Sequence, residues 1–202
     1  MTRRLLAAVL LLLPGFAMAQ TQYPALHDVT GVASDDVLNV RAEPRGDAPV
    51  IGALSFAAKF VEVVRVENGW GLVTLGEGSG WASLRYLKAQ PHTPGAFPDQ
   101  ISCYGTEPFW SLSYDGNNAL HYSDINGADR LMRVQSILRA QGRLDRHALI
   151  AGSEDGLVTA VYARAQCSDG MSDRAYGFSV DAVLRDPDGH VLLSGCCTIK
   201  PE

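Results

Sequence analysis

Positive charge is scarce in this chain, and its scarcity argues against two classes of partner. Charged residues make up 19% of the sequence, and 22 acidic residues outnumber 17 basic ones, which gives a net charge of −5. Nucleic-acid binding depends on a basic surface that neutralises phosphates, and the chain has too few basic residues to build one. Attraction to anionic lipid headgroups is disfavoured for the same reason. We therefore expect no nucleic-acid partner and no direct binding to a charged membrane surface.

Long apolar runs are also lacking. The run from Leu5 to Leu13 has nine residues, whereas a helix needs about 20 to span a bilayer. Arg3 and Arg4 precede this run, and Ala17-Met18-Ala19 follows it with small residues suited to a signal peptidase. These features predict a secretory signal over residues 1–19 and a periplasmic or secreted mature protein; an uncleaved anchor helix is the alternative. No cysteine follows the run directly, so we expect no lipid anchor and no stable membrane insertion after cleavage.

Proline and glycine gather near residue 90. Pro91, Pro94 and Pro98, together with Gly95, lie within residues 89–100. Proline lacks a backbone donor and disfavours helix in the residue before it, so this stretch is expected to be extended. It predicts a linker over residues 89–100, between a domain at 25–88 and a second domain at 101–202.

Short apolar and β-branched runs fill the first domain. Residues 60–66 are rich in valine, which is typical of a strand, and Asn68-Gly69 directly after them is a strong hairpin signal. Pro44 stops the strand that begins at Val37, because it cannot pair. Other turns are expected at residues 34–36 and 76–80. The predicted strands cover residues 29–32, 37–41, 50–54, 59–67, 69–74 and 81–84.

Three motifs of this domain resemble those of bacterial SH3 (SH3b) domains. They are Leu38-Asn39-Val40-Arg41 with Pro44 after it, Gly69-Trp70-Gly71-Leu72-Val73, and Gly80-Trp81-Ala82 followed by Tyr86. The resemblance implies a small SH3-like barrel with a binding role. It also implies peptidoglycan or an envelope protein as the partner.

Alternation along the first motif identifies candidate contact residues. Asn39 and Arg41 lie on the strand face opposite Leu38 and Val40, so they are expected to face outward. A guanidinium suits the carboxylates of wall peptides or of an acidic protein surface. The aromatic residues of the other motifs are further candidates for binding, although a small barrel also needs such residues for its core, and we favour that structural role. These are Trp70, Trp81 and Tyr86.

The second domain again has the pattern of short strands. Asp115-Gly116, Asp155-Gly156 and Asp188-Gly189 are turn signals between them. Residues 138–144 are the one stretch that is compatible with a short helix. The predicted strands cover residues 109–114, 119–123, 131–137, 148–151, 157–166, 176–184 and 190–197. Strands of this length and spacing predict an antiparallel β barrel or sandwich.

All four cysteines lie in the second domain, and an even count in an exported chain predicts two disulfides. Cys196 and Cys197 are adjacent, so in a strand they face opposite sides and should reach different partners. Cys103 and Cys167 are those partners, in either combination. A bridge between Cys196 and Cys197 themselves is the alternative. The spacing lacks the paired Cys-x-x-Cys of structural zinc sites, so we expect no metal, and no other cofactor is indicated.

Two further motifs include these cysteines: Cys103-Tyr-Gly-Thr-Glu-Pro-Phe-Trp110 and Cys167-Ser-Asp-Gly-Met-Ser-Asp173. They resemble an uncharacterised family of small bacterial envelope domains, and that resemblance implies no activity. Glu107, Asp169 and Asp173 are candidates for a carboxylate cluster, and the alternative, which we favour, is that such carboxylates cap backbone amides. Phe109 and Trp110 alternate, so one should be in the core while the other lines a cleft; Trp110 is our candidate.

No nucleophile and base converge in the sequence. Ser194-Gly195-Cys196 is faintly similar to the nucleophile segment of L,D-transpeptidases, but the histidine and the arginine of that segment are absent. We therefore expect no catalytic residue and no enzymatic activity. The predicted function is an exported, non-catalytic binding protein. The alternative is an envelope enzyme or an enzyme inhibitor that acts through the second domain.

Overall fold

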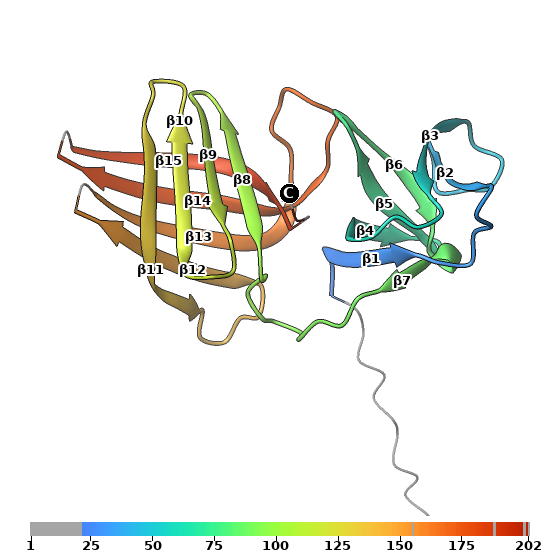
Figure 1. Ribbon diagram of the computed structural model, residues 1–202, viewed down its shortest axis with the longest axis horizontal. Coiled ribbons are helices and arrows are strands. Elements are labelled where there is room, and N and C mark those ends of the chain that lie inside the picture. The colour runs from blue at the N-terminus through green and yellow to red at the C-terminus, as the bar shows by residue number, and fades with distance from the viewer. Residues whose placement is uncertain (1–21, 155, 188, 200, 202) are drawn as a thin grey trace, which may run out of the picture.

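Two β domains lie side by side in the structure, a computed structural model that describes residues 22–154, 156–187, 189–199 and 201 (Figure 1). The expected all-β class is confirmed, since the described elements are strands apart from one short 3-10 helix. The predicted signal over residues 1–19 lies outside the described residues. No helix in the described part of the chain has the length and apolar character of a membrane span.

The first domain is a seven-stranded antiparallel sheet with the order β3-β2-β6-β5-β4-β1-β7. One face of the sheet surrounds the core, which includes Leu38, Val40, Val63, Val73 and Ala82. The alternating burial of β2 places Leu38 and Val40 inside, as the sequence predicts. The elements are β1 (Ala25–Val29), β2 (Val37–Arg41), β3 (Val50–Ser55), β4 (Val61–Glu67), β5 (Trp70–Leu75), β6 (Gly78–Ser83), the 3-10 helix η1 (Leu84–Tyr86) and β7 (Leu87–Ala89).

Turn residues set the strand boundaries of this domain. Asn68 and Gly69, both at positive φ, form the predicted two-residue turn between β4 and β5. The strand expected at residues 29–32 instead lies at β1, because Gly31 has a φ of +73° and extended pairing ends before it. Residues 78–80, expected within a turn, begin β6. Gly80 fits there because a Cβ would lie 2.6 Å from Val40 Cγ1.

The second domain is a closed antiparallel barrel of eight strands with the order β10-β11-β12-β13-β14-β15-β8-β9. The barrel, one of the two predicted alternatives, encloses a core to which Leu112, Leu120, Leu149, Tyr162 and Phe178 contribute from five different strands. The strands are β8 (Ile101–Thr106), β9 (Phe109–Tyr114), β10 (Ala119–Asp124), β11 (Asp129–Arg139), β12 (Arg146–Ser153), β13 (Gly156–Cys167), β14 (Tyr176–Asp186) and β15 (Gly189–Thr198).

The stretch that was compatible with a helix, residues 138–144, is not helical. Its first residues continue β11, where Ile137 and Leu138 pair with Leu149 and Ala148 of β12. The remainder connects the two strands. Pairing between strands therefore outweighs the local preference of this segment.

Both predicted disulfides are present, and the structure determines their connectivity. Cys103 joins Cys197 across the register of β8 and β15, and Cys167 joins Cys196. Cys197 belongs to the barrel core while Cys196 does not, so the adjacent cysteines face opposite sides as expected.

Residues 90–100 connect β7 to β8 without forming a strand or a helix. Gly95 is buried, and its carbonyl oxygen lies 3.1 Å from Nε2 of His147. The ring of Phe97 packs edge-on to Tyr162 with 5.1 Å between centroids. This segment is therefore packed against the second domain over part of its length.

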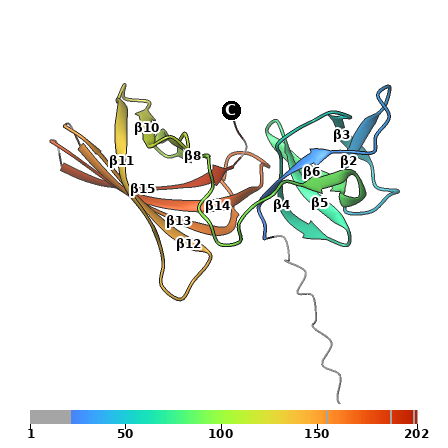
Figure 2. The same cartoon turned by 60° about the horizontal axis from the view of Figure 1, so that its bottom comes forward.

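The residues that lead into β1 also contact the barrel. Arg164 Nη1 donates to the carbonyl oxygen of Pro24 at 2.8 Å, and Leu26 packs against the barrel core. Gly177 of β14 lies so close to Pro24 that a Cβ there would be 2.3 Å from the proline Cγ. The first domain is thereby held against one side of the barrel (Figure 2).

The connection between β13 and β14 forms a second contact between the domains. Ala175 N–H donates to Ser79 Oγ at 2.7 Å, and Thr74 Oγ1 donates to the Ala175 carbonyl at 3.3 Å. Nearby in the interface, the hydroxyl of Thr198 donates to the buried carboxylate of Glu62. In Figure 1 the connection between β13 and β14, drawn in orange, reaches the tip of β5 and β6. The two domains thus meet through several polar contacts as well as apolar packing.

Candidate functional site

A cleft of about 260 Å³ lies on the first domain, between the loop after β1, β2 and η1. We call it the first-domain cleft. It brings together four of the five binding candidates predicted in this domain, namely Asn39, Arg41, Trp70 and Tyr86. The remaining lining residues are Gly31, Val32, Ala33, Asp36, Val37, Leu38 and Ser83.

Aromatic residues contribute to two walls of this cleft. Trp70 is the first residue of β5 and directly follows the Asn68-Gly69 turn, which leaves its ring half-buried. Tyr86 ends η1, and the guanidinium of Arg85 lies 5.6 Å from its ring centroid. Gly31, at positive φ, faces Tyr86 from the opposite loop. A half-buried Trp and Tyr offer a ligand apolar area together with a polar edge.

Polar groups complete the cleft. Asp36 is exposed, and its Oδ1 accepts a hydrogen bond from Val37 N–H at 2.7 Å. Arg41 is half-buried rather than fully outward, and its Nη1 donates to the Ala48 carbonyl at 2.7 Å. This corrects the expectation that Arg41 points freely to solvent, because the same guanidinium also holds the loop between β2 and β3.

Trp81 does not join this cleft. Its side chain is only 6% exposed, and the Arg65 guanidinium covers its ring at 4.5 Å from the centroid. Ala82, the next residue, faces the core, so Trp81 faces the other side of the sheet. Trp81 therefore has the structural role that we favoured for it, and its candidacy as a ligand contact is corrected.

A second cleft of about 260 Å³ lies on the outside of the barrel, beside the Cys167–Cys196 disulfide. We call it the barrel cleft. Its lining residues are Tyr104, Gly105, Thr106, Cys167, Ser168, Asp169, Ser179, Val180, Asp181, Ser194, Gly195 and Cys196. Five of these residues carry a hydroxyl group and two carry a carboxylate, and no basic side chain is among them.

Asp169 caps the loop that follows β13. Its Oδ1 accepts from the N–H groups of Met171 and Ser172 at 3.0 and 2.9 Å. Its Oδ2 accepts from the hydroxyls of Ser172 and Tyr176 at 2.8 and 3.2 Å. Partial burial acts to raise the pKa of Asp169, but these hydrogen bonds outweigh it and the pKa is lowered. The favoured alternative, a carboxylate that caps backbone amides, is confirmed for Asp169.

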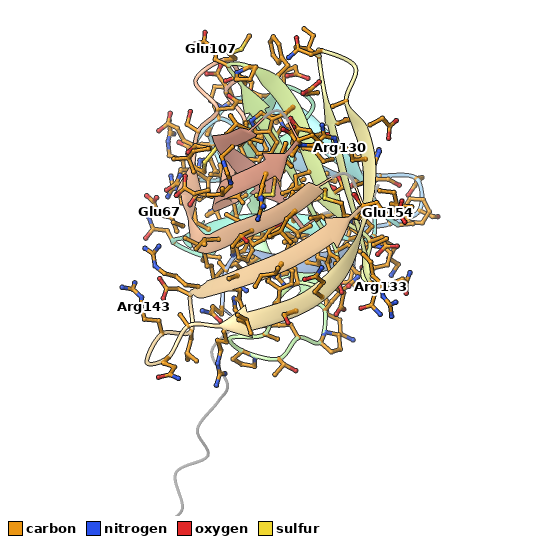
Figure 3. The ribbon with its side chains drawn as sticks, turned by 90° about the vertical axis from the view of Figure 1, so that its left-hand side faces the viewer. Glu67, Glu107, Arg130, Arg133, Arg143 and Glu154 are labelled. Atoms are coloured by element: carbon orange, nitrogen blue, oxygen red, sulfur yellow. A yellow bond between two sulfur atoms is a disulfide. The ribbon has the colours of Figure 1, made fainter. Side chains whose placement is uncertain are left out.

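The other two members of the expected carboxylate cluster do not line the barrel cleft. Asp173 and Glu107 are both exposed, and Figure 3 shows Glu107 at the outer rim of the barrel. Among the described residues, no group of three His, Cys, Asp or Glu side chains is placed to hold a metal ion. The cluster, which was the less favoured alternative, is therefore not formed, since only Asp169 contributes to the cleft.

Phe109 and Trp110 alternate as expected, but with the roles exchanged. Trp110 is 5% exposed, and its indole packs against Gly105 and Gly195, where any Cβ would collide with it. Phe109 is 49% exposed. Trp110 is thus a core residue rather than a ligand contact, and Phe109 is the aromatic residue available at the surface.

Sequence reasoning missed several residues that line the two clefts. Asp36 was assigned only to a turn, whereas the structure places it in the lining of the first-domain cleft. Asp181 lies on β14 with no motif around it, and its Oδ1 accepts from Ser194 Oγ at 2.5 Å. Cys196, considered as a nucleophile, is bonded to Cys167.

Comparison with known proteins identifies part of the chain. Residues 36–88 match the family model described as Bacterial SH3 domain. The matched range begins just before β2 and ends within β7, so it contains most of the first-domain cleft. The match supports the resemblance of the first domain to bacterial SH3 domains, which suggests a cell-wall or peptidoglycan-binding module. It does not extend to the second domain, whose resemblance to envelope domains stays a prediction.

No curated protein matches the chain, and no solved structure matches it.

Proposed function

We propose that this protein is an exported, non-catalytic binding protein whose first domain recognises peptidoglycan or a protein of the envelope. The observation that supports it most directly is the first-domain cleft, where Trp70, Tyr86 and Arg41 lie together within a bacterial SH3 domain. A concave site with aromatic walls and a few placed polar groups is typical of ligand recognition.

The chemistry of the cleft fits a peptide ligand. Arg41 offers a guanidinium to a carboxylate, and Asp36 offers an acceptor to an ammonium or amide group. Trp70 and Tyr86 provide apolar area in the same cleft. Wall peptides and the acidic segments of envelope proteins both contain such groups.

Retention on purified cell-wall sacculi, beside a parallel capture from envelope extract, tests this proposal. Trp70→Ala should weaken retention about tenfold, the effect expected of a central aromatic contact. Phe56→Ala is the matched control, because Phe56 is an exposed aromatic residue of the same domain that does not line the cleft. Equal retention of both variants, with both folded, would place the binding site elsewhere.

The non-catalytic part of the proposal is supported by Cys196. A nucleophile needs a free thiolate, and Cys196 is in a disulfide. Disulfides are also typical of extracytoplasmic compartments, which agrees with export. Cell fractionation tests the location, and incubation with sacculi followed by analysis of released fragments tests for activity. Release of muropeptides by the purified protein would contradict a binding role alone.

A further inference from the structure

The barrel is closed by a short pairing, and this leaves part of β15 without a neighbour on one side. Cys196, Cys197 and Thr198 pair with β8, whereas residues 189–197 all pair with β14 on the other side. Gly195 still lies against the backbone of Tyr104. Beyond it, Ser194 lies level with Thr106, the last residue of β8, but is not paired with it, and residues 189–193 extend past the end of β8. No strand of the described chain pairs with the outer side of residues 189–194. We call these six residues the β15 edge.

Exposure along β15 agrees with a protruding edge. Val191 and Leu192 are consecutive, so they face opposite sides of the strand, yet they are 44% and 67% exposed. On the neighbouring β14, burial alternates normally between Val183 and Leu184. Figure 1 shows β15 extending with β14 beyond β8 and β9, and Figure 3 looks onto this end of the barrel.

The β15 edge lacks the features that usually prevent pairing with another chain. Natural edge strands are protected by lysine, proline, inward charges or bulges. Residues 189–194 have the sequence Gly-His-Val-Leu-Leu-Ser, without a lysine, a proline or an acidic residue. Residues 134–139 of β11 also extend beyond β10, but that stretch contains Arg139. Of these two strand edges of the barrel, the one on β15 is therefore the less protected.

The barrel cleft lies where β8 and β15 separate. Thr106 and Gly105 form one side of it, and Ser194 with Asp181 form another. Ser194, Asp181 and the disulfide at Cys196 share the outer face of the sheet. A residue paired opposite Ser194 would extend its side chain over this cleft. Because Asp169 and Asp181 line the cleft without a basic neighbour in the lining, a positively charged side chain is the complementary one.

We propose that the β15 edge binds an extended peptide segment of a partner protein by strand addition, with a basic side chain of that peptide in the barrel cleft. Main-chain hydrogen bonds to residues 189–194 provide the pairing, as in other strand-addition complexes. The three peptide residues next to the basic one lie beside Leu193, Leu192 and Val191 and are apolar; they follow the basic residue in an antiparallel pairing and precede it in a parallel one. The segment is therefore one basic residue with three apolar residues on one side of it. The two possible orders of these residues correspond to the two pairing directions.

The probe is a capped, fluorescein-labelled hexapeptide Thr-Lys-Val-Val-Val-Thr, together with the peptide of reversed order. One of the two should bind the folded full chain and slow amide hydrogen exchange at residues 189–194. Replacing the peptide lysine by glutamate should weaken binding at least about fivefold, and an N-methylated backbone should abolish it. Binding of neither peptide, equal binding of the glutamate peptide, or binding of the N-methylated peptide overturns the proposal.

Variants of the protein separate the β15 edge from other surfaces. Leu192→Lys should weaken peptide binding at least about tenfold, because lysine on an edge opposes pairing and repels the basic residue. Asp181→Asn should weaken it about two- to fivefold, the effect of one exposed charge pair. Leu138→Lys, on the β11 edge, is the matched control and should leave binding unchanged.

The opposite pattern, with Leu138→Lys weakening binding and Leu192→Lys without effect, contradicts the proposal. A protein that is already a dimer through β15 also contradicts the proposal. Light scattering would show the dimer, and hydrogen exchange would show that residues 189–194 are protected in it. Circular dichroism establishes that each variant is folded before it is used. None of these readouts depends on the first-domain cleft, so Trp70→Ala should bind the peptide normally.

Discussion

Arg41 shows how one side chain serves both the fold and the candidate site. Its guanidinium lines the first-domain cleft and also donates to the Ala48 carbonyl. Arg41→Ala should therefore lower the free energy of unfolding by about 1.5 kcal/mol, the value of a hydrogen bond from a charged donor. It should weaken retention on sacculi as well.

Lys88→Ala, which removes an exposed basic residue from β7, is the control for Arg41. Urea unfolding should show a change within about 0.5 kcal/mol for Lys88→Ala, as is usual for surface positions. If Arg41→Ala is as stable as Lys88→Ala, the loop between β2 and β3 does not depend on the hydrogen bond from Arg41 to Ala48.

Asp169 makes the stability of the barrel dependent on pH. Because its pKa is lowered in the folded protein, its contribution is fully present above the pKa of the unfolded chain. That contribution is lost as the pH falls through the lowered folded-state pKa. Asp169→Asn should cost about 1–2 kcal/mol at neutral pH, and the difference from the unaltered protein should shrink below about pH 4.

Urea unfolding across this pH range measures the effect of Asp169. Asp173→Asn is the matched control, since Asp173 is exposed in the same loop and outside the barrel cleft. A pH-independent difference for Asp169→Asn would mean that the lost hydrogen bonds do not require the ionised carboxylate.

At the scale of elements, the two disulfides stabilise the barrel unequally. Cys103–Cys197 closes a loop with a sequence separation of 94, and Cys167–Cys196 one of 29. Loop-closure entropy predicts about 4.7 kcal/mol for the longer loop and about 3.6 kcal/mol for the shorter. The first pair is also fully enclosed in the core, so its removal leaves a cavity.

Paired Cys→Ala replacements followed by chemical unfolding measure this difference. The Cys103/Cys197 double variant should be the less stable of the two by at least about 1 kcal/mol. Mass spectrometry of the non-reduced protein should first establish the absence of free thiols. Equal stabilities would mean that loop length does not determine the contribution of either bridge.

Two glycines of the barrel have a structural role that is visible only at the level of strands. Gly105 of β8 and Gly195 of β15 both lie against the Trp110 indole, and a Cβ at Gly105 would be 2.0 Å from its Nε1. Their absence of side chains allows Trp110 to close the core where β8 and β15 separate. The position of the barrel cleft follows from this packing.

At the scale of the whole molecule, the contacts between domains limit where the linker is accessible. Residues 91–94 are exposed, whereas Gly95 is buried and Phe97 packs on the barrel. Limited proteolysis should therefore cut first within residues 91–94 and leave residues 95–98 intact. The predicted domain boundary also requires that each half folds when it is expressed alone. Initial cleavage elsewhere, or failure of both halves to fold, would contradict that boundary.

Gly177 tests whether the domain interface protects the linker. Gly177→Ala should accelerate cleavage of the linker, because the added Cβ would displace Pro24. Gly46→Ala is the control, since no atom outside its chain neighbours lies within 4 Å of the added Cβ. Similar cleavage rates for both variants would mean that the linker is protected without the contact at Pro24.

Local features of the sequence determined the β class, the hairpin at Asn68-Gly69 and the pairing of Cys103 and Cys167 with Cys196 and Cys197. They also determined the alternation of Leu38 and Asn39, and of Phe109 and Trp110. Each of these depends on the backbone preference of a few adjacent residues, or on the strict alternation of side chains in a strand. Such properties can be predicted without knowing which residues of other strands lie opposite.

Only the tertiary structure decided which cysteine joins which, that Trp81 is covered by Arg65, and that Trp110 rather than Phe109 is in the core. It alone gathered the two clefts and left residues 189–194 of β15 without a neighbour on one side. The physical reason is register: each of these features depends on how strands far apart in the sequence align. A shift of one residue in that alignment would turn every side chain to the other face.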